Sequence, residues 1–302
     1  PITLTYPWTT WWAVPTTRPG GKSLRRKPIM NHDSENNSNP ALIKIIKDNP
    51  NLFTLWNDTE RQLPNCFLRI MYMNDYARIT GVNRAQTNYA FCKIEPFSNN
   101  VETDKDYLAT MVIASDALIT DIGHELMHLY IHSIGYPFIV PTYKYGEVLD
   151  NSAEILEMDK LATRIHDVTV HPIIDRNLTT INLFDNQVWE RMFRNHSNEL
   201  QSYLKNPNYF KDKNYIVIRT IELQHRLPPE MWQQIETMFK ERPSYQRLLG
   251  KIKQLPCFPD NLSPQNVYEY ITNMWKYYRI KPEQLNLDLT FNSPLLQKPH
   301  SS

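Results

Sequence analysis

The segment from Gly123 to His132 constrains this 302-residue chain more than any other part of it. It reads GHELMHLYIH and contains the pattern H-E-x-x-H. Residues four apart stack one turn above another on an α-helix, so His124 and His128 would present two imidazoles on one helix face. Glu125 lies next to that face, within reach of a water molecule at a metal ion. This spacing predicts a zinc site with two histidine ligands and a glutamate general base.

The residues around the pattern predict the helix that it needs. Between Asp116 and His132 there is no proline, and Gly123 is the single glycine. Apolar residues recur at spacings of 4, 4 and 3 and define one stripe of the helix: Leu118, Ile122, Leu126 and Leu129. The histidines and Glu125 fall on the adjoining arc. One flank is therefore expected to enter the core and the other to line a cleft, with a cap from Ser115, Asp116 or Thr120.

Composition is typical of a globular protein and argues against several kinds of partner. The 33 Lys and Arg residues are balanced by 32 Asp and Glu residues, which gives no overall attraction to nucleic acid or to an anionic membrane. No run of 18 apolar residues occurs, so no transmembrane helix is expected. The three cysteines fit neither a disulfide framework nor a CxxC zinc site, which favours reduced thiols and a cytoplasmic location.

The residues before the motif helix predict a small sheet. Residues 1–40 are rich in proline and polar residues and are expected to form an irregular arm, whereas residues 41–60 carry helical spacing. Four strand candidates follow: Phe67–Met73, Arg78–Val82, Tyr89–Ile94 and Tyr107–Ala114. A small sheet whose last strand leads into the H-E-x-x-H helix is the order expected of a zincin. In such enzymes that last strand commonly borders the cleft and pairs with an extended substrate.

The C-terminal half is expected to be mainly helical. Four segments carry apolar residues at spacings of three or four, with breakers between them: Gln187–Leu204, Pro229–Lys240, Pro243–Leu255 and Ser263–Tyr278. Asn214–Ile221 could be a strand or a helix. The predicted fold class is α+β, with an arm at 1–40, a zincin-like core of small mixed sheet and motif helix at 41–170, and a mainly helical region at 171–302.

A third metal ligand is expected C-terminal to the motif helix. Apolar residues mark one stripe of a second helix: Ile155, Met158, Leu161, Ala162 and Ile165. Glu154 falls inside this stripe, whereas Glu157 falls about 40° outside it. A carboxylate within an apolar stripe is costly unless a cation meets it, so Glu154 is the preferred ligand and Glu157 the alternative. An ordinary salt bridge would be the structural explanation for Glu154.

Further polar residues are candidates for supporting roles. His132 shares the arc of His124 and His128, but three consecutive turns of one straight helix cannot give tetrahedral coordination to one ion. His132 is therefore expected to support the ligands or to fill the core, whereas Asp150, Asn151 or whichever of Glu154 and Glu157 is not a ligand could orient His124 or His128. Candidates for a donor to the oxyanion are Tyr143, Tyr145, His166 and His171. The histidines of the C-terminal half are otherwise interpreted as structural: His171, His196 and His225.

HELMHLYIHSIG resembles the H-E-L-x-H-x-x-x-H-x-x-G helix of the ImmA/IrrE family of gluzincin-like metallopeptidases. The segment from Glu154 to Ile165, acidic and then Leu161-Ala162, is similar to the downstream acidic helix of that family. The resemblance covers roughly residues 65–170, about a third of the chain. It implies that the glutamate of the second motif is the third zinc ligand. It also implies a regulatory role, in which a repressor or another host protein is cleaved or controlled.

The sequence therefore predicts a zinc-dependent metallopeptidase that hydrolyses a peptide bond in a specific protein substrate, such as a regulator or a host factor. Zn²⁺ is expected on His124, His128 and Glu154, with Glu125 as the general base. The rival hypothesis is a protein-binding or scaffold protein whose zinc site is structural or vestigial. Two histidines, one glutamate and an adjacent Glu125 leave an open coordination position, which favours the enzyme.

Overall fold

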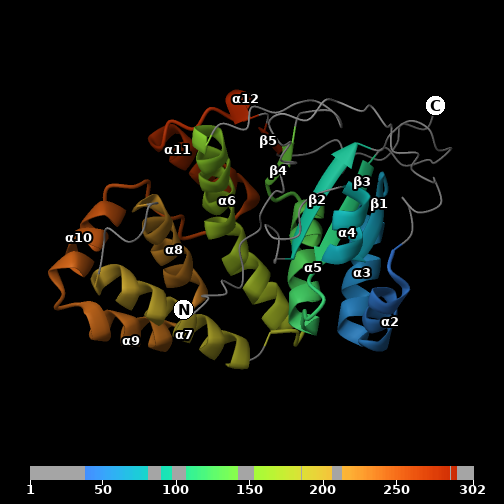
Figure 1. The fold of residues 1–302 in the computed structure, drawn as a ribbon, viewed down its shortest axis with the longest axis horizontal. Coiled ribbons are helices and arrows are strands. Elements are labelled where there is room, and N and C mark those ends of the chain that lie inside the picture. Colours follow the sequence, from blue (N-terminus) through green and yellow to red (C-terminus); the bar gives the residue numbers. More distant parts are fainter. Residues whose placement is uncertain are drawn as a thin grey trace. The chain divides into compact units, whose positions relative to one another are not determined.

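The computed structural model describes residues 38–80, 90–96, 107–141, 153–184, 186–205, 213–285 and 287–290. The chain is a mixed α and β structure that is mostly helical and contains a small sheet (Figure 1). It divides into two compact units. The first comprises residues 1–135, 140–153 and 292–302, and the second comprises residues 136–139 and 154–291.

The described residues of the first unit form helices around a three-stranded sheet. The helices are α2 (Pro40–Asp48), α3 (Pro50–Gln62), α4 (Met73–Thr80) and α5 (Ile119–Ser133). The strands are β1 (Cys66–Tyr72), β2 (Phe91–Pro96) and β3 (Tyr107–Ile113). β3 lies between the other two, parallel to β1 and antiparallel to β2. Three of the four predicted strands and the motif helix are thereby confirmed.

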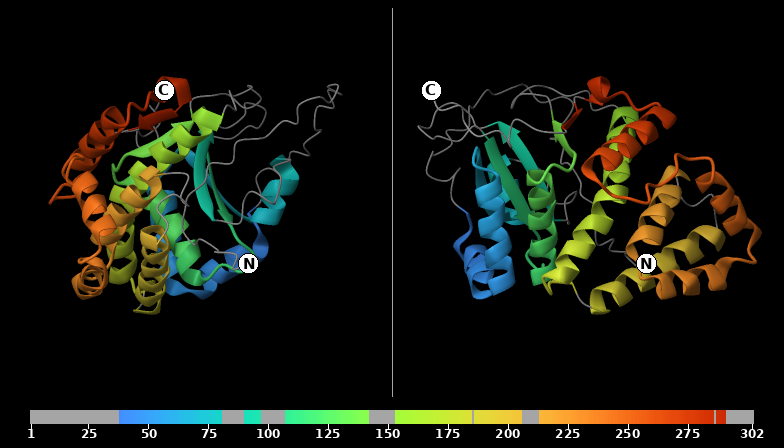
Figure 2. Two further views of the ribbon diagram at one scale, coloured as in Figure 1. Left: turned by 60° about the vertical axis from the view of Figure 1, so that its left-hand side comes forward. Right: turned by 180° about the vertical axis from the view of Figure 1, so that it is seen from behind.

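Helices cover both faces of this sheet. On one face, α4 contributes Met73 and Tyr76 to a buried apolar cluster with three strand residues, Met71, Phe91 and Val112. Side chains alternate between the faces of a strand, so Ile70 and Met111, which are also fully buried, point to the opposite face. There α3 packs on β1, and α5 packs on β2 and β3 (Figure 2). The motif helix is thus seated on a buried sheet face.

Two sequence predictions about this sheet are wrong. Arg78–Val82 was predicted as a strand, but its described residues belong to α4, where Met73, Tyr76 and Ala77 recur at helical spacing and are buried. The strand before the motif helix was expected to border a cleft and pair with substrate. β3 instead pairs with β1 on one side and with β2 on the other, so its backbone groups are already used within the sheet.

The helical segment predicted at 41–60 is two helices that divide at Asn49. The Asn49 side-chain Oδ1 accepts hydrogen bonds from the backbone N–H of Asn51 and of Leu52, both at 3.1 Å, and Pro50 occupies the first turn. Asparagine at this position and proline just inside the helix are both favoured at helix starts. The Asn49-Pro50 pair therefore ends α2 and begins α3.

Replacement of Asn49 by alanine is expected to lower the free energy of unfolding by about 1 kcal/mol, because two backbone N–H groups at the start of α3 lose their acceptor. Chemical denaturation measures this change. Asn57→Ala is the matched control, since Asn57 is exposed in the middle of the same helix. There the same substitution is expected to stabilise slightly, by up to about 0.7 kcal/mol, because alanine is the better helix former. Equal effects at the two positions would contradict the capping role of Asn49.

The described residues of the second unit are almost entirely helical. The longer helices are α6 (Ala153–Thr180), α7 (Asn186–Lys205), α8 (Lys213–Arg226), α9 (Pro229–Phe239), α10 (Pro243–Ile252) and α11 (Pro264–Tyr277). A short helix, α12 (Pro282–Leu285), follows, and β4 (Phe138–Pro141) pairs with β5 (Leu287–Thr290). The four predicted helices of this region are confirmed, and the ambiguous segment at 214–221 is helical.

α6 differs most from its prediction. It runs without interruption through Pro172, so the boundary expected between residues 170 and 171 lies inside one helix. The two units divide near its start, at Glu154. Proline removes one backbone hydrogen bond from a helix interior, but the helix is buried on both sides of it, at Val168, Val170, Ile173 and Ile174. This burial holds the two halves of α6 in one helix.

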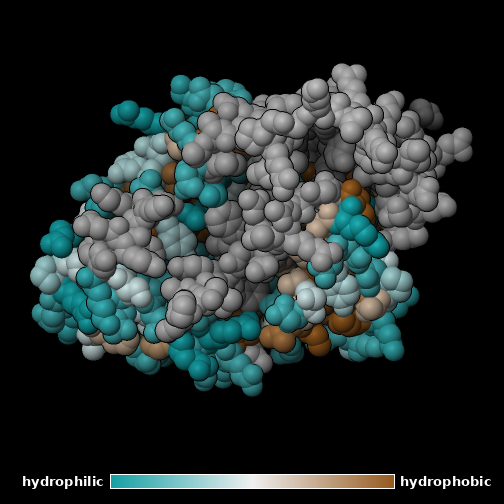
Figure 3. Space-filling view, viewed as in Figure 1, coloured by the Kyte–Doolittle hydropathy of each residue, from teal (hydrophilic) through white to brown (hydrophobic). Residues whose placement is uncertain are grey.

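On the face of the molecule drawn in Figure 3, several helices of the second unit present a largely polar surface. Teal, hydrophilic residues dominate the coloured area over α7, α9 and α10, and brown areas are small (Figure 3). Among the residues that the structure describes, no helix has the length and apolar character needed to cross a membrane.

Candidate metal centre

The motif helix α5 forms where the sequence pattern predicts it, but a different residue caps its first turn. The backbone N–H of Leu118 donates a 2.8 Å hydrogen bond to the Asp121 carboxylate. Asp121 therefore caps the start of the helix, where Ser115, Asp116 or Thr120 was expected to do so. Leu118 itself is 51% exposed and does not belong to the core. The remaining residues of the predicted apolar stripe are buried: Ile122, Leu126 and Leu129.

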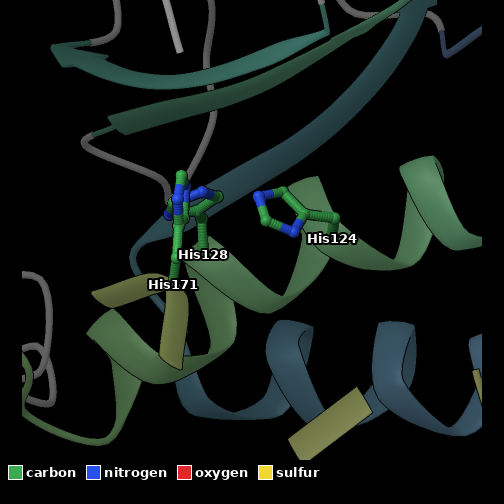
Figure 4. A group of neighbouring side chains, drawn as sticks. All are labelled: His124, His128 and His171. Carbon is green, nitrogen blue, oxygen red and sulfur yellow. The ribbon is translucent and has the colours of Figure 1, made fainter. Parts of the chain in front are cut away.

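The polar arc of α5 is buried as completely as the apolar stripe. His124, Glu125, His128 and His132 are each at most 3% exposed. The rings of His124 and His128 project from the same side of the helix, with centroids 4.9 Å apart and planes at 79° (Figure 4). Burying a polar side chain is costly unless a hydrogen bond, an opposite charge or a metal compensates it. The four side chains therefore form a buried polar arc beside the apolar stripe of α5.

Three buried histidines meet the distance requirement for a metal site. His124 and His128 of α5 and His171 of α6 each offer one ring nitrogen, and these nitrogens lie within 4.8 Å of one another (Figure 4). Ligand nitrogens in tetrahedral zinc sites are about 3.4 Å apart, because each Zn–N bond is about 2.0–2.1 Å. Small side-chain rotations would cover the difference. The group could hold a metal ion, and three imidazoles suit several transition metals.

The predicted third ligand, Glu154, is not part of this group. It is exposed in the first turn of α6, seventeen residues before His171, which corresponds to about 25 Å along a helix axis. A carboxylate in the first turn of a helix is stabilised by the backbone N–H groups there. Glu154 therefore needs no metal ion, although its helical phase matches that of the apolar stripe. The alternative, Glu157, is also exposed, and its carboxylate lies 2.8 Å from the ammonium of Lys160.

The supporting candidates fall into three cases. His132 is buried one turn beyond His128 and is outside the group of three histidines. His166 is buried, with Nε2 3.1 Å from the Pro137 carbonyl oxygen and Nδ1 3.3 Å from a carboxylate oxygen of Asp167. Asp150, Tyr143 and Tyr145 lie outside the described residues. The roles suggested for all of these residues remain predictions.

His171 is surrounded by carboxylates within the second unit. Its Nδ1 lies 2.7 Å from Oε1 of Glu222, which comes from α8, and its Nε2 lies 4.0 Å from Oδ1 of Asp167, one turn earlier on α6. All three side chains are buried. One buried carboxylate therefore lies beside each nitrogen of this imidazole.

Two buried arginines of α8 neutralise part of this charge. Arg226 donates to both oxygens of Asp175, from Nε at 2.6 Å and from Nη2 at 3.0 Å, and its Nη1 donates to Oε1 of Glu222 at 2.7 Å. Arg219 donates to Oε2 of Glu222 at 2.7 Å. Burial alone would raise the pKa of Glu222, but Arg219, His171 and Arg226 together hold it well below its usual 4.5. Glu222 is therefore an ionised acceptor at neutral pH.

Sequence reasoning treated His171 as structural or as one of several oxyanion candidates, and did not consider it as a ligand. The phase of α6 carried a usable signal, because Asp167 and His171 are four residues apart and share a face with buried apolar residues such as Ile174. The ligand was sought only in the segment that ends at Ile165, six residues before His171, although α6 continues through Pro172.

The chain was compared with known proteins in three ways. No protein-family model matches it, and neither the curated proteins nor the solved structures gave a significant match. The resemblance to the ImmA/IrrE family therefore remains a prediction that rests on the motif residues.

Proposed function

We propose that this protein is a zinc-dependent metallopeptidase in which His124, His128 and His171 hold one zinc ion. The observation that carries the proposal is the buried H-E-x-x-H pattern on α5, with two imidazoles on one side of the helix and Glu125 beside them at 3% exposure. A chance match to this pattern on a surface helix would leave these side chains in water, where they cost nothing. The burial of these side chains supports a functional site that they form together.

The chemistry of the donors fits zinc. Three neutral imidazoles with a fourth position open to solvent or substrate form the ligand set of one class of catalytic zinc sites. In this proposal His171 takes the place that the sequence gave to Glu154, which changes the ligand set from two histidines and a carboxylate to three histidines. The resulting site has a higher net positive charge, because no anionic ligand offsets the ion.

Peptide hydrolysis would use this site and Glu125 together. A bound zinc ion supplies Lewis acidity, which polarises the carbonyl of the scissile peptide and makes a nearby water molecule more acidic. The Glu125 carboxylate accepts a proton from this water as the water oxygen attacks the carbonyl carbon. Glu125 then passes the same proton to the leaving amine as the C–N bond breaks. Burial of Glu125 keeps bulk water from competing for that proton.

The substrate class that we propose is a specific protein, such as a regulator or a host factor, as the motif resemblance implies. A scaffold protein with a structural zinc site is the second candidate. Structural sites are usually closed by four protein ligands, commonly cysteines. The metal-ligand group found among the described residues contains three histidines and no cysteine, although Cys66 and Cys92 are buried in the same unit as α5. This composition favours an open, catalytic site.

Metal analysis of the purified protein tests the centre. The wild type is expected to contain about one zinc per chain, and His128→Ala and His171→Ala are expected to lose it, because two imidazoles hold the ion far more weakly than three. Glu154→Ala and His132→Ala are the controls and are expected to keep the metal. Zinc absent from the wild type would refute the proposal. Loss of zinc from Glu154→Ala but not from His171→Ala would restore the ligand set expected from the sequence.

A further inference from the structure

We propose that Glu222 is a positioning residue, which fixes the proton of His171 on Nδ1 and thereby directs the Nε2 lone pair to the metal. This inference rests on the proposed metal centre, but its basis lies wholly in the second unit. His171 comes from α6 and Glu222 from α8, and both side chains are buried. The Nδ1–Oε1 distance of 2.7 Å is that of a short hydrogen bond to a charged acceptor.

Two contacts of Nδ1 compete for its proton, because Arg226 Nη1 can only donate and the Glu222 carboxylate can only accept. Arg226 Nη1 lies 2.7 Å from Oε1 of Glu222 and 3.0 Å from Nδ1 of His171, so three polar atoms form a small triangle. If Nδ1 carried a lone pair, it would face the carboxylate oxygen, another acceptor, at 2.7 Å. With the proton on Nδ1, Oε1 accepts from both Nδ1 and Nη1. The second arrangement satisfies Oε1 twice and leaves two donors, Nδ1 and Nη1, 3.0 Å apart, whereas the first leaves two acceptors, one of them charged, only 2.7 Å apart. The shorter contact to the charged acceptor favours the proton on Nδ1.

Glu222 is held so that it cannot turn away from His171. Its Oε2 accepts from Arg219 Nη1 at 2.7 Å, while its Oε1 accepts from Arg226. Arg226 is fixed in turn by its two hydrogen bonds to Asp175, one turn after His171 on α6. Ligand histidines commonly donate their second ring nitrogen to a carboxylate, and such a carboxylate sets the orientation and basicity of the ring. The clamp of two arginines gives Glu222 this role for His171.

The charges of the cluster also favour a cation at His171. Glu199, which accepts from Tyr215 and lies 3.8 Å from Arg219, completes a buried set of three carboxylates and two guanidiniums: Asp175, Glu199, Glu222, Arg219 and Arg226. Asp167, buried beside Nε2, adds a further carboxylate. Buried charges need nearby compensation, and a metal cation at the Nε2 lone pair of His171 would offset part of this negative charge.

Two measurements on the full chain test the inference, with Glu199→Gln as a matched control. Glu222→Gln and Glu199→Gln each remove one buried carboxylate that contacts Arg219, but Glu222 alone contacts His171. Nitrogen NMR of the metal-free protein is expected to show a proton on Nδ1 of His171 in the wild type and in Glu199→Gln. Competition with a zinc chelator is expected to show about 10–100-fold weaker zinc binding for Glu222→Gln and less than about threefold change for Glu199→Gln.

Each outcome supports or overturns the inference. An unprotonated Nδ1 in the wild type would overturn it, whether or not zinc binds. Equal loss of zinc affinity in the two glutamine variants would show a general effect of charge and would also overturn it. If Glu222→Gln does not fold, Glu222→Asp keeps the charge for both arginines and withdraws the acceptor from Nδ1. Zinc binding by Glu222→Asp as tight as in the wild type would then overturn it. A wild type with Nδ1 protonated but without zinc would instead refute the proposed metal centre.

Discussion

Replacement of Glu125 by glutamine is expected to lower the rate of peptide-bond hydrolysis by about 10²–10⁴-fold, because the amide cannot take the proton of the attacking water. The amide has nearly the same shape as the carboxylate, so bound zinc and the fold of α5 are expected to be unchanged. The measurement compares the proteins that are cleaved in cells expressing the wild type with those cleaved in cells expressing the variant. One or a few cleavage products are expected to disappear in the variant.

Glu157→Gln is the matched control for this experiment. It makes the same chemical change at an exposed carboxylate whose ion pair with Lys160 lies on the surface of α6. Cleavage is expected to continue unchanged in this variant. Full hydrolytic activity in Glu125→Gln would refute the proposed mechanism. No cleavage by either form, together with a binding partner that both forms retain equally, would favour the scaffold.

Replacement of Arg226 by methionine is expected to lower the free energy of unfolding by about 3–5 kcal/mol. The side chain of Arg226 is 1% exposed, and it donates to Asp175 and Glu222, whose side chains are 2% and 8% exposed. Methionine fills much of the space of the arginine stem but removes the positive charge. Asp175 then loses the guanidinium that binds both of its oxygens, and Glu222 loses one of its two guanidinium partners, in the interior of the second unit. Urea denaturation of the purified variant measures the loss.

A surface ion pair provides the comparison for Arg226. Arg194 lies 3.9 Å from Glu190 on α7, with side chains that are 71% and 62% exposed. Arg194→Met is expected to change the stability by less than about 1 kcal/mol, because water screens such a pair and replaces it when it is lost. Similar effects of the two substitutions would mean that the buried cluster tolerates an uncompensated charge, contrary to the expectation.

The sequence by itself determined the elements whose periodicity is local. The apolar spacing of α5, three of the four predicted strands and the four helices predicted beyond residue 170 are present in the structure near their predicted bounds. The same local geometry placed His124, Glu125 and His128 on one arc of a helix, because helix pitch alone fixes that relation. These features depend on residues within a few positions of one another, so a pattern read along the chain was sufficient.

Only the tertiary structure decided the relations between distant segments. Pairing placed β3 between β1 and β2, with one parallel and one antiparallel neighbour, and no local sequence pattern specifies which strands pair with it. The third histidine of the metal-ligand group, His171, follows His128 by 43 residues, and no spacing rule links positions that far apart. Glu154 had the favourable helical phase but lies in an exposed first turn. Helical phase gives the direction of a side chain, whereas burial depends on which elements cover that part of the helix.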